Sequence, residues 1–282
     1  MKTSTVISQD LLDELQDVAT IGVDIGSRTG KAALLTKDEL SLAITATSID
    51  MQQTADYLIE KVLKQAGLGI SDISHVVGTG YGRIAFKSDD VPIRIVTEIS
   101  CHGLGAHYLN SSTETIIDIG GQDSKAIKID RENGKVVDFI MNDKCAAGTG
   151  RFLERVAELL DVSLEESGEL SLSSKGGQEI SSQCVVFAES EIITLKTKGA
   201  PKEDILNAVN LASARRVRNL VNRIGLKPEM VFSGGVSQNP GMKAALEQVI
   251  GHGFTNTNLD MTYNGALGAA IFAQKYYLGT ES

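Results

Sequence analysis

Two segments of the chain begin with the same pattern of residues. VDIGSRTGKAALL starts at Val23 and IDIGGQDSKAIKI starts at Ile117, and they align without a gap at Asp, Ile, Gly, Lys and Ala. Each segment has the pattern of a β-strand, a glycine-containing turn and a second strand of β-branched and aliphatic residues, which predicts a hairpin. The duplication predicts two halves built on one plan, each with a turn that faces a ligand.

A helix with small residues on one face is expected after each hairpin. Residues 99–108 contain GLGA and residues 264–277 contain GALGAA. Small residues let two helices cross closely, so we expect these helices to cross at a hinge, with the two DIG turns facing each other across a cleft. The predicted domain order is an N-terminal extension (1–20), lobe I (21–112), lobe II (113–262) and a C-terminal connecting helix (263–282).

The segments around the hairpins predict further helices and strands. We expect a helix at 51–66 and strands at 75–77, 135–141 and 229–232. A mainly helical insertion at about 142–225 breaks the symmetry of the repeat and contains two of the three cysteines. Near-helical spacing of apolar residues predicts a short amphipathic helix at the N-terminus, with Ile7, Leu11, Leu12, Leu15 and Val18 on its apolar face.

Composition and charge limit the classes of partner. The chain has 282 residues, of which 42% are hydrophobic, so it can bury a full core. Its formal net charge of −9 leaves no excess of Lys or Arg for phosphate backbones, which argues against nucleic acid and anionic membranes. Backbone amides can still bind a small nucleotide. The acidic first residues do not match a secretory signal, and no apolar run approaches the length of a membrane span, so we expect a cytoplasmic protein.

Five motifs resemble those of the actin-like ATPase superfamily and follow its order along the chain; the superfamily includes sugar kinases, actin and heat-shock chaperone ATPase domains. DIGSRTGK from Asp24 resembles its first phosphate loop, IDIGGQD from Ile117 its second, and FSGGVSQN from Phe232 its adenosine loop. TEISCHGLGAH and YNGALGAA are similar to its two connecting helices. The resemblance covers the whole chain and implies an α/β actin-like ATPase fold, with two duplicated lobes, a nucleotide cleft and a helical insertion in the second lobe.

Three further motifs narrow this resemblance. GTGYGR from Gly78, NDKCAAGTGRF from Asn142 and SSQCVVFAESE from Ser181 resemble the activators (component A) of 2-hydroxyacyl-CoA dehydratases, ATPases of the BadF/BadG/BcrA/BcrD type, and more distantly the ATPase subunits of benzoyl-CoA reductases. The resemblance implies a homodimer with one 4Fe-4S cluster at its interface, binding of ATP, ADP and Mg²⁺, and ferredoxin or flavodoxin as electron donor. The chain departs from the family pattern at Arg28 in the first loop and in its N-terminal extension.

The three cysteines are too few and too scattered for a disulfide framework. A four-iron cluster needs four thiolates, and a two-fold axis between two chains would supply Cys145 and Cys184 twice. Spacing alone favours a buried packing role for both, as we expect for Cys101, whereas the surrounding motifs favour cluster ligands. Both candidate ligands are expected at helix starts, where the helix dipole stabilises a thiolate.

The phosphate loops, the adenosine loop and the glycine cluster after Cys145 supply candidate nucleotide-binding residues, because glycine lets backbone N–H groups approach phosphates closely. Asp24 and Asp118, equivalent in the repeat, are candidate Mg²⁺ ligands, directly or through water, although each could instead cap its turn. Lys31 and Lys125 are interpreted as strand residues rather than phosphate ligands. The candidate nucleotide-binding residues are Asp24, Gly26, Ser27, Arg28, Thr29, Gly120, Gly121, Gln122, Asp123, Gly148, Thr149, Gly150, Gly234, Gly235 and Asn239.

Glu98 opens the first connecting helix and resembles the glutamate that heat-shock chaperone ATPases place near the attacking water. It is the first candidate to position that water, with Asp118 and Gln122 as further catalytic candidates and Asp123 as an alternative. Equally, Glu98 could be a helix-start carboxylate that interacts with the helix dipole.

Three classes of function remain open from the sequence. The leading hypothesis is an ATP-dependent redox activator of a 2-hydroxyacyl-CoA dehydratase, or of another iron–sulfur enzyme such as a benzoyl-CoA reductase. In it, ATP draws the lobes together and changes the angle of the helices that carry Cys145 and Cys184. A sugar-type kinase lacks support, because no insertion for a sugar pocket and no Asp placed as a base for a hydroxyl is found. A nucleotide-dependent scaffold without catalysis is the third class.

Overall fold

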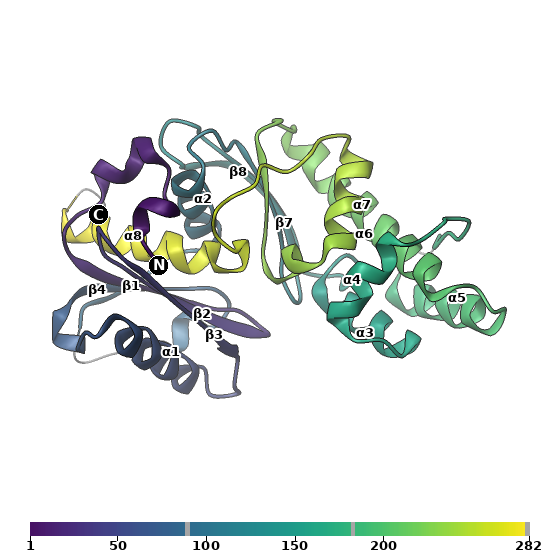
Figure 1. The fold of residues 1–282 in the computed structure, drawn as a ribbon, viewed down its shortest axis with the longest axis horizontal. Helices are drawn as coiled ribbons and strands as arrows, with labels where there is room; N and C mark the ends of the chain where they lie inside the picture. Colours follow the sequence, from purple (N-terminus) through teal and green to yellow (C-terminus); the bar gives the residue numbers. More distant parts are fainter. Residues whose placement is uncertain (88–90, 182–183, 280–282) are drawn as a thin grey trace. The chain divides into compact units, whose positions relative to one another are not determined.

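The computed structural model describes residues 1–87, 91–181 and 184–279. The chain divides into two compact units (Figure 1). The first unit comprises Met1–Glu114, Lys128–Val137 and Asn256–Ser282, and the second comprises Thr115–Ile127 and Asp138–Thr255. None of the helices in the described residues combines the length and the apolar character that a membrane span requires.

A five-stranded sheet forms the base of the first unit. Its order is β3-β2-β1-β4-β5, with β1 antiparallel to β2 and parallel to β4. The predicted first hairpin is thereby confirmed. Every residue of β1 after Ala19 is buried, because helices cover both faces of the sheet. The strands are β1 (Ala19–Ile25), β2 (Thr29–Leu35), β3 (Leu40–Ala46), β4 (Ile73–Thr79) and β5 (Ile93–Ile95).

Three helices cover this sheet. Helix α1 (Met51–Ala66) packs on one face, where Leu58 and Val62 join the core of the strands. Helices α2 (Glu98–Leu109) and α8 (Asn264–Tyr277) contribute to a second cluster around Val77. Figure 1 shows α1 and α8 on opposite faces of the strands. The helix predicted at 51–66 is confirmed, and its ends are set by an Asp N-cap and a left-handed glycine C-cap.

Helices α2 and α8 cross at very short range, as their small residues predict. A β-carbon at Gly268 would lie 1.8 Å from the carbonyl oxygen of Cys101, and one at Gly105 would lie 2.4 Å from that of Asn264. Only glycine leaves room for backbone at these distances. The crossing therefore depends on the small residues of the GLGA and GALGAA segments.

The second sheet repeats the strand order of the first. Its order is β8-β7-β6-β9, and β6 is parallel to β9. The central strands of both sheets thus form the same arrangement, which confirms the duplication read from the sequence. The strands are β6 (Thr115–Ile119), β7 (Ser124–Ile129), β8 (Val136–Asn142) and β9 (Met230–Ser233).

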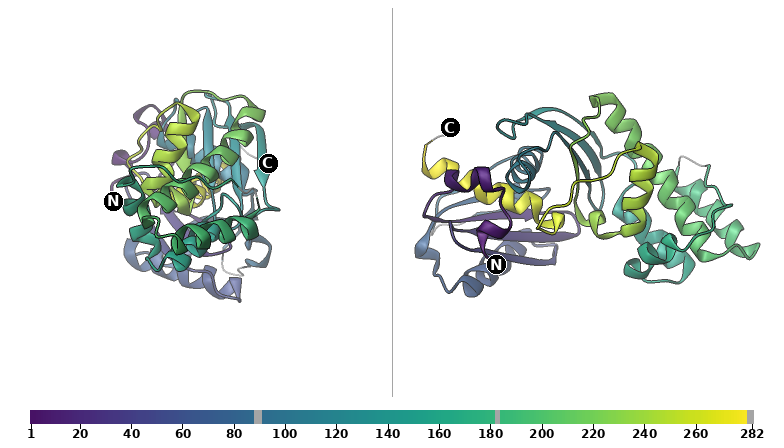
Figure 2. Two further views of the ribbon diagram at one scale, coloured as in Figure 1. Left: turned by 90° about the vertical axis from the view of Figure 1, so that its right-hand side faces the viewer. Right: turned by 45° about the horizontal axis from the view of Figure 1, so that its top comes forward.

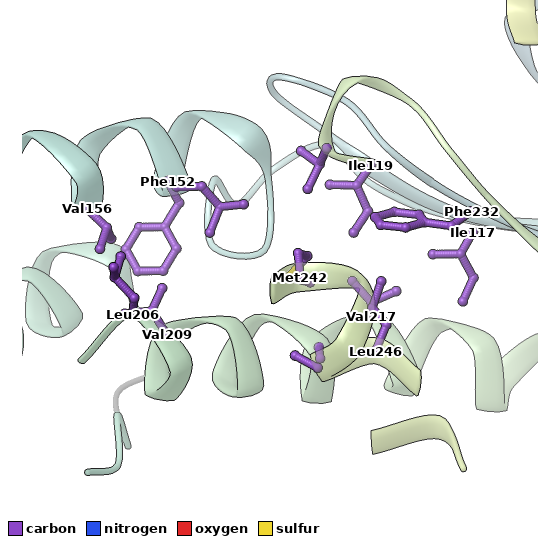
Figure 3. Close-up of a cluster of buried hydrophobic side chains, with 14 of the residues drawn as sticks. Ile117, Ile119, Phe152, Val156, Leu206, Val209, Val217, Phe232, Met242 and Leu246 are labelled. Carbon is purple, nitrogen blue, oxygen red and sulfur yellow. The ribbon is translucent and has the colours of Figure 1, made fainter. Parts of the chain in front are cut away.

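Helices of the second unit pack around one large apolar core (Figure 3). Side chains from β6, such as Ile117, meet Val217 of α6 and Leu246 of α7, while Phe152 of α3 extends the cluster. The predicted helical insertion is therefore folded onto the sheet rather than detached from it. The helices are α3 (Gly150–Leu160), α4 (Leu164–Leu172), α5 (Val185–Thr197), α6 (Lys202–Ile224) and α7 (Pro240–Ile250).

The N-terminal segment does not form the predicted amphipathic α-helix. It forms two short 3₁₀ helices, Thr3–Thr5 and Gln9–Glu14, beside α8 (Figure 2). Leu11 and Leu15 are buried, so their apolar role is as expected. The amide of Ser8 donates to the carbonyl of Tyr108 on α2 (2.7 Å), and Leu15 is already extended, which leaves too short a stretch for an α-helix. The other 3₁₀ helices are Ile70–Asp72, Arg83–Ala85, Gly235–Gln238 and Met261–Tyr263.

Candidate functional site

The two DIG turns are closed by the same backbone hydrogen bond. In the first loop the amide of Gly26 donates to the carbonyl of Thr29 (3.2 Å), and in the second loop the amide of Gly120 donates to that of Asp123 (3.0 Å). These donors and acceptors are equivalent positions of the repeat. The internal repeat is therefore a repeat of turn structure as well as of residues.

The carbonyls of the first loop are held by the residue that follows β3. The hydroxyl of Thr47 donates to the carbonyl of Gly26 (2.7 Å), and its amide donates to that of Arg28 (3.0 Å). With its carbonyls engaged on the protein side, this loop can offer amide groups to an anion.

The carbonyls of the second loop are held by the first turn of α3. The amides of Gly150 and Arg151 donate to the carbonyls of Gly120 and Gly121, each at 2.9 Å. The first four amides of any helix lack intrahelical acceptors, so α3 uses two of them to fix the loop. The glycine cluster that ends at Gly150 thereby positions the second loop.

A buried aspartate lies at the end of the first strand of each repeat, under a glycine with positive φ. In the first unit, a β-carbon at Gly80 (φ 85°) would lie 2.4 Å from Asp24 Oδ1. In the second unit, a β-carbon at Gly234 (φ 87°) would lie 2.9 Å from Asp118 Oδ1. Only glycine combines this backbone conformation with such close contact. The GTGYGR turn and the predicted adenosine loop are therefore equivalent parts of the repeat.

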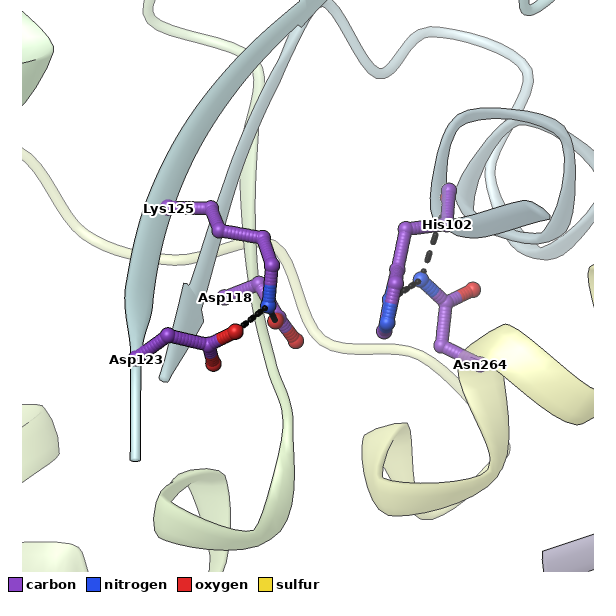
Figure 4. A network of polar contacts seen from close by, with 5 residues as sticks. All are labelled: His102, Asp118, Asp123, Lys125 and Asn264. Atoms are coloured by element: carbon purple, nitrogen blue, oxygen red, sulfur yellow. Dashed lines mark hydrogen bonds and ion pairs between the residues drawn. The ribbon is translucent and has the colours of Figure 1, made fainter. Parts of the chain in front are cut away.

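Lys125 connects the two acidic groups of the second loop (Figure 4). Its Nζ lies 3.1 Å from Asp118 Oδ2 and 2.9 Å from Asp123 Oδ2. The side chains of Lys125 and Asp118 are each only 3% exposed, so this is a largely desolvated ion pair. Lys125 is a strand residue, as predicted, but its ammonium group lies at the candidate site.

A second buried polar group ties α2 to α8 (Figure 4). Nδ2 of Asn264 lies 3.2 Å from His102 Nδ1 and donates to the carbonyl of His102 at 3.1 Å. Both residues are buried. This contact fixes the start of α8 against the middle of α2.

The remaining catalytic and adenosine candidates have the following places. Glu98 is half-buried in the first turn of α2, and Gln122 is exposed in the second loop. Gly235 is exposed and open, whereas the side chain of Asn239 caps α7 by accepting from the amide of Met242 at 2.9 Å. The cap commits the Asn239 side-chain oxygen to the protein.

The three cysteines have three different environments. Cys101 is fully buried on α2, where burial raises the pKa of its thiol, so its predicted packing role is confirmed. Cys184 is exposed and is the N-cap residue of α5, as expected for a helix start. Cys145 is half-buried in a loop whose helix begins only at Gly150, so its prediction at a helix start is wrong.

The loop of Cys145 is nevertheless well anchored. Nδ2 of Asn142 donates to the carbonyl of Cys145 (2.9 Å), and the guanidinium of Arg216 lies against its sulfur, with Nη1 3.8 Å from Sγ. The physical reason for the late helix start is Gly148, whose φ of 85° turns the chain before α3. Among the described residues, no group of three or more His, Cys, Asp or Glu that could hold a metal ion is found. Ser182 and Gln183, part of the motif around Cys184, lie outside the described residues.

Sequence reasoning missed three features of the site. The interpretation of Lys125 as a strand residue omits its place at the site, although the repeat aligns it with Lys31 just as it aligns the two aspartates. The equivalence of Gly80 and Gly234 was also missed, because the strands before them share only an apolar run. Arg216 carried no signal, since it lies 71 positions from Cys145 in the chain.

Comparison with known proteins gives a consistent family. Residues 21–273 match the profile of the BadF/BadG/BcrA/BcrD ATPase family. The 2-hydroxyisocaproyl-CoA dehydratase activator of Clostridioides difficile is 41% identical over 255 residues, which is 90% of this chain and 94% of the relative.

Two solved structures share the fold at high similarity. The crystal structure of Acidaminococcus fermentans (R)-2-hydroxyglutaryl-CoA dehydratase component A has a TM-score of 0.87 at 39% identity, covering 93% of this chain and 99% of the other. The activator of the 2-hydroxyisocaproyl-CoA dehydratase from Clostridium difficile, with bound ADPNP, has a TM-score of 0.84 at 38% identity, covering 93% and 97%. The chain therefore has the predicted actin-like ATPase fold.

Proposed function

Because the chain belongs to the BadF/BadG/BcrA/BcrD ATPase family, we propose that it is an ATP-hydrolysing activator that delivers a low-potential electron from an iron–sulfur cluster to a 2-hydroxyacyl-CoA dehydratase. Its named relatives include a dehydratase activator at 41% identity. The observation that carries the proposal in this chain is the accessibility of Cys145 and Cys184, in contrast to the buried Cys101.

The donor chemistry of these two cysteines fits a shared cluster. Cys184 is exposed at the N-terminus of α5, where the helix dipole favours an anionic ligand, and Cys145 receives an Arg216 N–H on its sulfur. Two chains would provide four thiolates, the set that a 4Fe-4S cluster requires. When bound, such a cluster accepts and releases single electrons at low potential.

The surface beside Cys184 supports a homodimer. Val186 is 67% exposed and Phe187 is 65% exposed in the first turn of α5, and Ile193 is half exposed further along. Large apolar side chains in this position would be covered by a second copy on a two-fold axis that passes near the cysteines. We propose ferredoxin or flavodoxin as the external electron donor.

Each phosphate loop is proposed to bind ATP phosphates through its amides. Asp24 and Asp118 are proposed as Mg²⁺ ligands, directly or through water. Lys125 partly neutralises Asp118, which favours a water-mediated contact between Asp118 and the metal ion. Glu98 and Gln122 are proposed to position the attacking water, with Asp118 as a further catalytic candidate.

A short segment of the second unit would connect ATP hydrolysis at the second phosphate loop to electron transfer at Cys145. The chain runs from Cys145 through Gly148 into Gly150 and Arg151, whose amides hold the carbonyls of the second phosphate loop. A movement of that loop on nucleotide binding or hydrolysis would therefore be transmitted to the segment between Cys145 and Arg151. The proposal therefore assigns this segment to the coupling of ATP hydrolysis and electron transfer.

Anaerobically purified protein tests the proposal. We expect one 4Fe-4S cluster per two chains, a brown absorbance in the visible range and the mass of a dimer in solution. Cys145→Ser and Cys184→Ser are each expected to lose the iron and the absorbance, because each removes two of four ligands from the dimer.

Cys101→Ala is the matched control, since it removes the buried thiol and is expected to keep a full complement of iron. A Cys145→Ser protein that retains the iron and colour of the wild type would refute the cluster assignment. Wild-type dimer that hydrolyses ATP but never binds iron would refute the electron-transfer function and leave only the ATPase.

A further inference from the structure

Arg216 of α6 is the charged side chain that the structure records on the sulfur of Cys145. Its Nη1 donates toward Sγ at 3.8 Å, within the range of a hydrogen bond to sulfur. Its Nη2 is buried and has no hydrogen-bond partner among the described residues. One donor of the guanidinium fork therefore contacts the sulfur, and a second lies close by without an acceptor from the protein.

The position of Arg216 is fixed by its surroundings. Its neighbour on α6, Val217, belongs to the apolar core, which sets the rotation of the helix. Its aliphatic stem passes Gly148, where a β-carbon would lie 3.8 Å from Arg216 Cδ. The same loop is held at Cys145 by Asn142 and at Thr149 by a hydroxyl that donates to the carbonyl of Ala146 (2.6 Å). The positions of the Cys145 sulfur and the Arg216 guanidinium are thus both fixed by packing and hydrogen bonds.

We propose that Arg216 is a positioning residue that raises the reduction potential of the cluster bound by Cys145. The proposal rests on the proposed function, because it needs a cluster on that sulfur. In the dimer each cluster would have two such arginines, one from each chain. Nη2 would be available to donate to an acceptor that the bound cluster supplies.

Electrostatics give the direction of the effect. Reduction adds one negative charge to an anionic cluster, so a fixed positive charge beside a ligand sulfur stabilises the reduced form more than the oxidised form. Hydrogen bonds to the sulfurs act in the same direction. A buried N–H without an acceptor costs free energy in the unloaded protein, and that cost is relieved when the cluster accepts the bond.

Arg215, the preceding residue, provides a matched control. Its side chain is 47% exposed and its Nη1 pairs with Glu179 at 3.4 Å. It carries the same charge on the same helix but points to solvent. A change at Arg215 therefore alters the net charge of the protein without altering the group that contacts Cys145.

The test is the midpoint potential of the cluster, measured by an anaerobic redox titration followed by electron paramagnetic resonance, in samples matched for iron content. For Arg216→Gln we expect the equilibrium constant for one-electron reduction to fall about tenfold, a shift of about 59 mV to lower potential. Arg216→Lys keeps the charge but loses the second donor, so we expect a smaller shift in the same direction. Arg215→Gln is expected to leave the potential unchanged.

Three results would overturn the proposal: an unchanged potential in both Arg216 variants, a shift to higher potential, or an equal shift in Arg215→Gln. If Arg216→Gln does not assemble a cluster, the potential of Arg216→Lys decides the question. Failure of the proposed function is distinguishable, because wild-type protein would then contain no cluster to titrate.

Discussion

The two DIG hairpins share residues and backbone turns but hold their lysine and their loop in different ways. In the first unit, Lys31 donates to the carbonyl of Thr29 (3.3 Å), whereas its counterpart Lys125 bridges two carboxylates in the second unit. The position that is Thr29 in the first loop is Asp123 in the second. The first repeat therefore has a turn contact to a neutral carbonyl where the second has an ion network with two carboxylates.

The loops also differ in what supports them. Thr47, at the end of a β-strand, holds the first loop with one side chain and one amide, while the first turn of α3 holds the second loop with two amides. The α3 support continues directly into the Cys145 segment. The duplication therefore yields one loop held by the residue after β3 and one held by the helix that follows the Cys145 segment.

The largest expected effect is on the free energy of unfolding when the two equivalent lysines are replaced. Lys125→Met should lower the free energy of unfolding by about 4 kcal/mol, because it leaves two carboxylates without their buried partner. Lys31→Met should cost about 1 kcal/mol, the loss of one hydrogen bond to a neutral acceptor. Urea unfolding of both variants measures the difference, and equal losses would contradict the asymmetry.

The glycines over the two aspartates test what the repeats have in common. Gly234→Ala and Gly80→Ala should each destabilise the protein by about 3 kcal/mol, because positive φ and a close backbone contact both oppose a β-carbon. Gly235→Ala, where nothing lies within 4 Å, is the control and should change stability by less than about 0.5 kcal/mol. Thermal and urea unfolding provide the measurement. A tolerated Gly80→Ala would show that the two turns are not equivalent.

The support of the second loop can be removed without touching the loop itself. Arg151→Pro deletes the amide that donates to Gly121, at a first-turn position where a helix tolerates proline. We expect the affinity for ADP to fall about tenfold, or about 1.4 kcal/mol. Arg151→Ala keeps the amide and should bind as the wild type does. Calorimetric titration distinguishes them, and equal affinities would mean that α3 does not position the loop.

Removing the Thr47 contact that supports the first loop should have the smallest effect on stability and on ADP affinity. Thr47→Val removes the hydroxyl that donates to Gly26 but keeps the amide that donates to Arg28, so we expect a loss of stability of about 1 kcal/mol. The fall in ADP affinity should be smaller than that of Arg151→Pro. Thr45→Val, two residues earlier in β3, is the control. A larger fall in affinity for Thr47→Val than for Arg151→Pro would reverse the comparison.

Local patterns in the sequence were sufficient for most of the fold. The first hairpin, the helix at 51–66 and the close crossing of α2 and α8 follow from strand periodicity, a capped amphipathic helix and glycines at the crossing, all of which are short-range properties. The N-terminal segment was predicted as an α-helix because its apolar spacing fits one. Its contacts with α2 and β3, distant in sequence, decide that it forms 3₁₀ turns.

The paired DIG hairpins, the two aspartates and the cysteines worth testing can be found in the sequence, because repeats and motifs are visible along one chain. Which groups surround them depends on how the chain packs. Lys125 reaches Asp118 and Asp123 across a turn, Gly234 closes on a neighbouring strand, and Arg216 meets Cys145 from a helix 71 positions away. Hydrogen bonds and ion pairs act over a few ångströms of space, and packing, rather than separation along the chain, sets those distances.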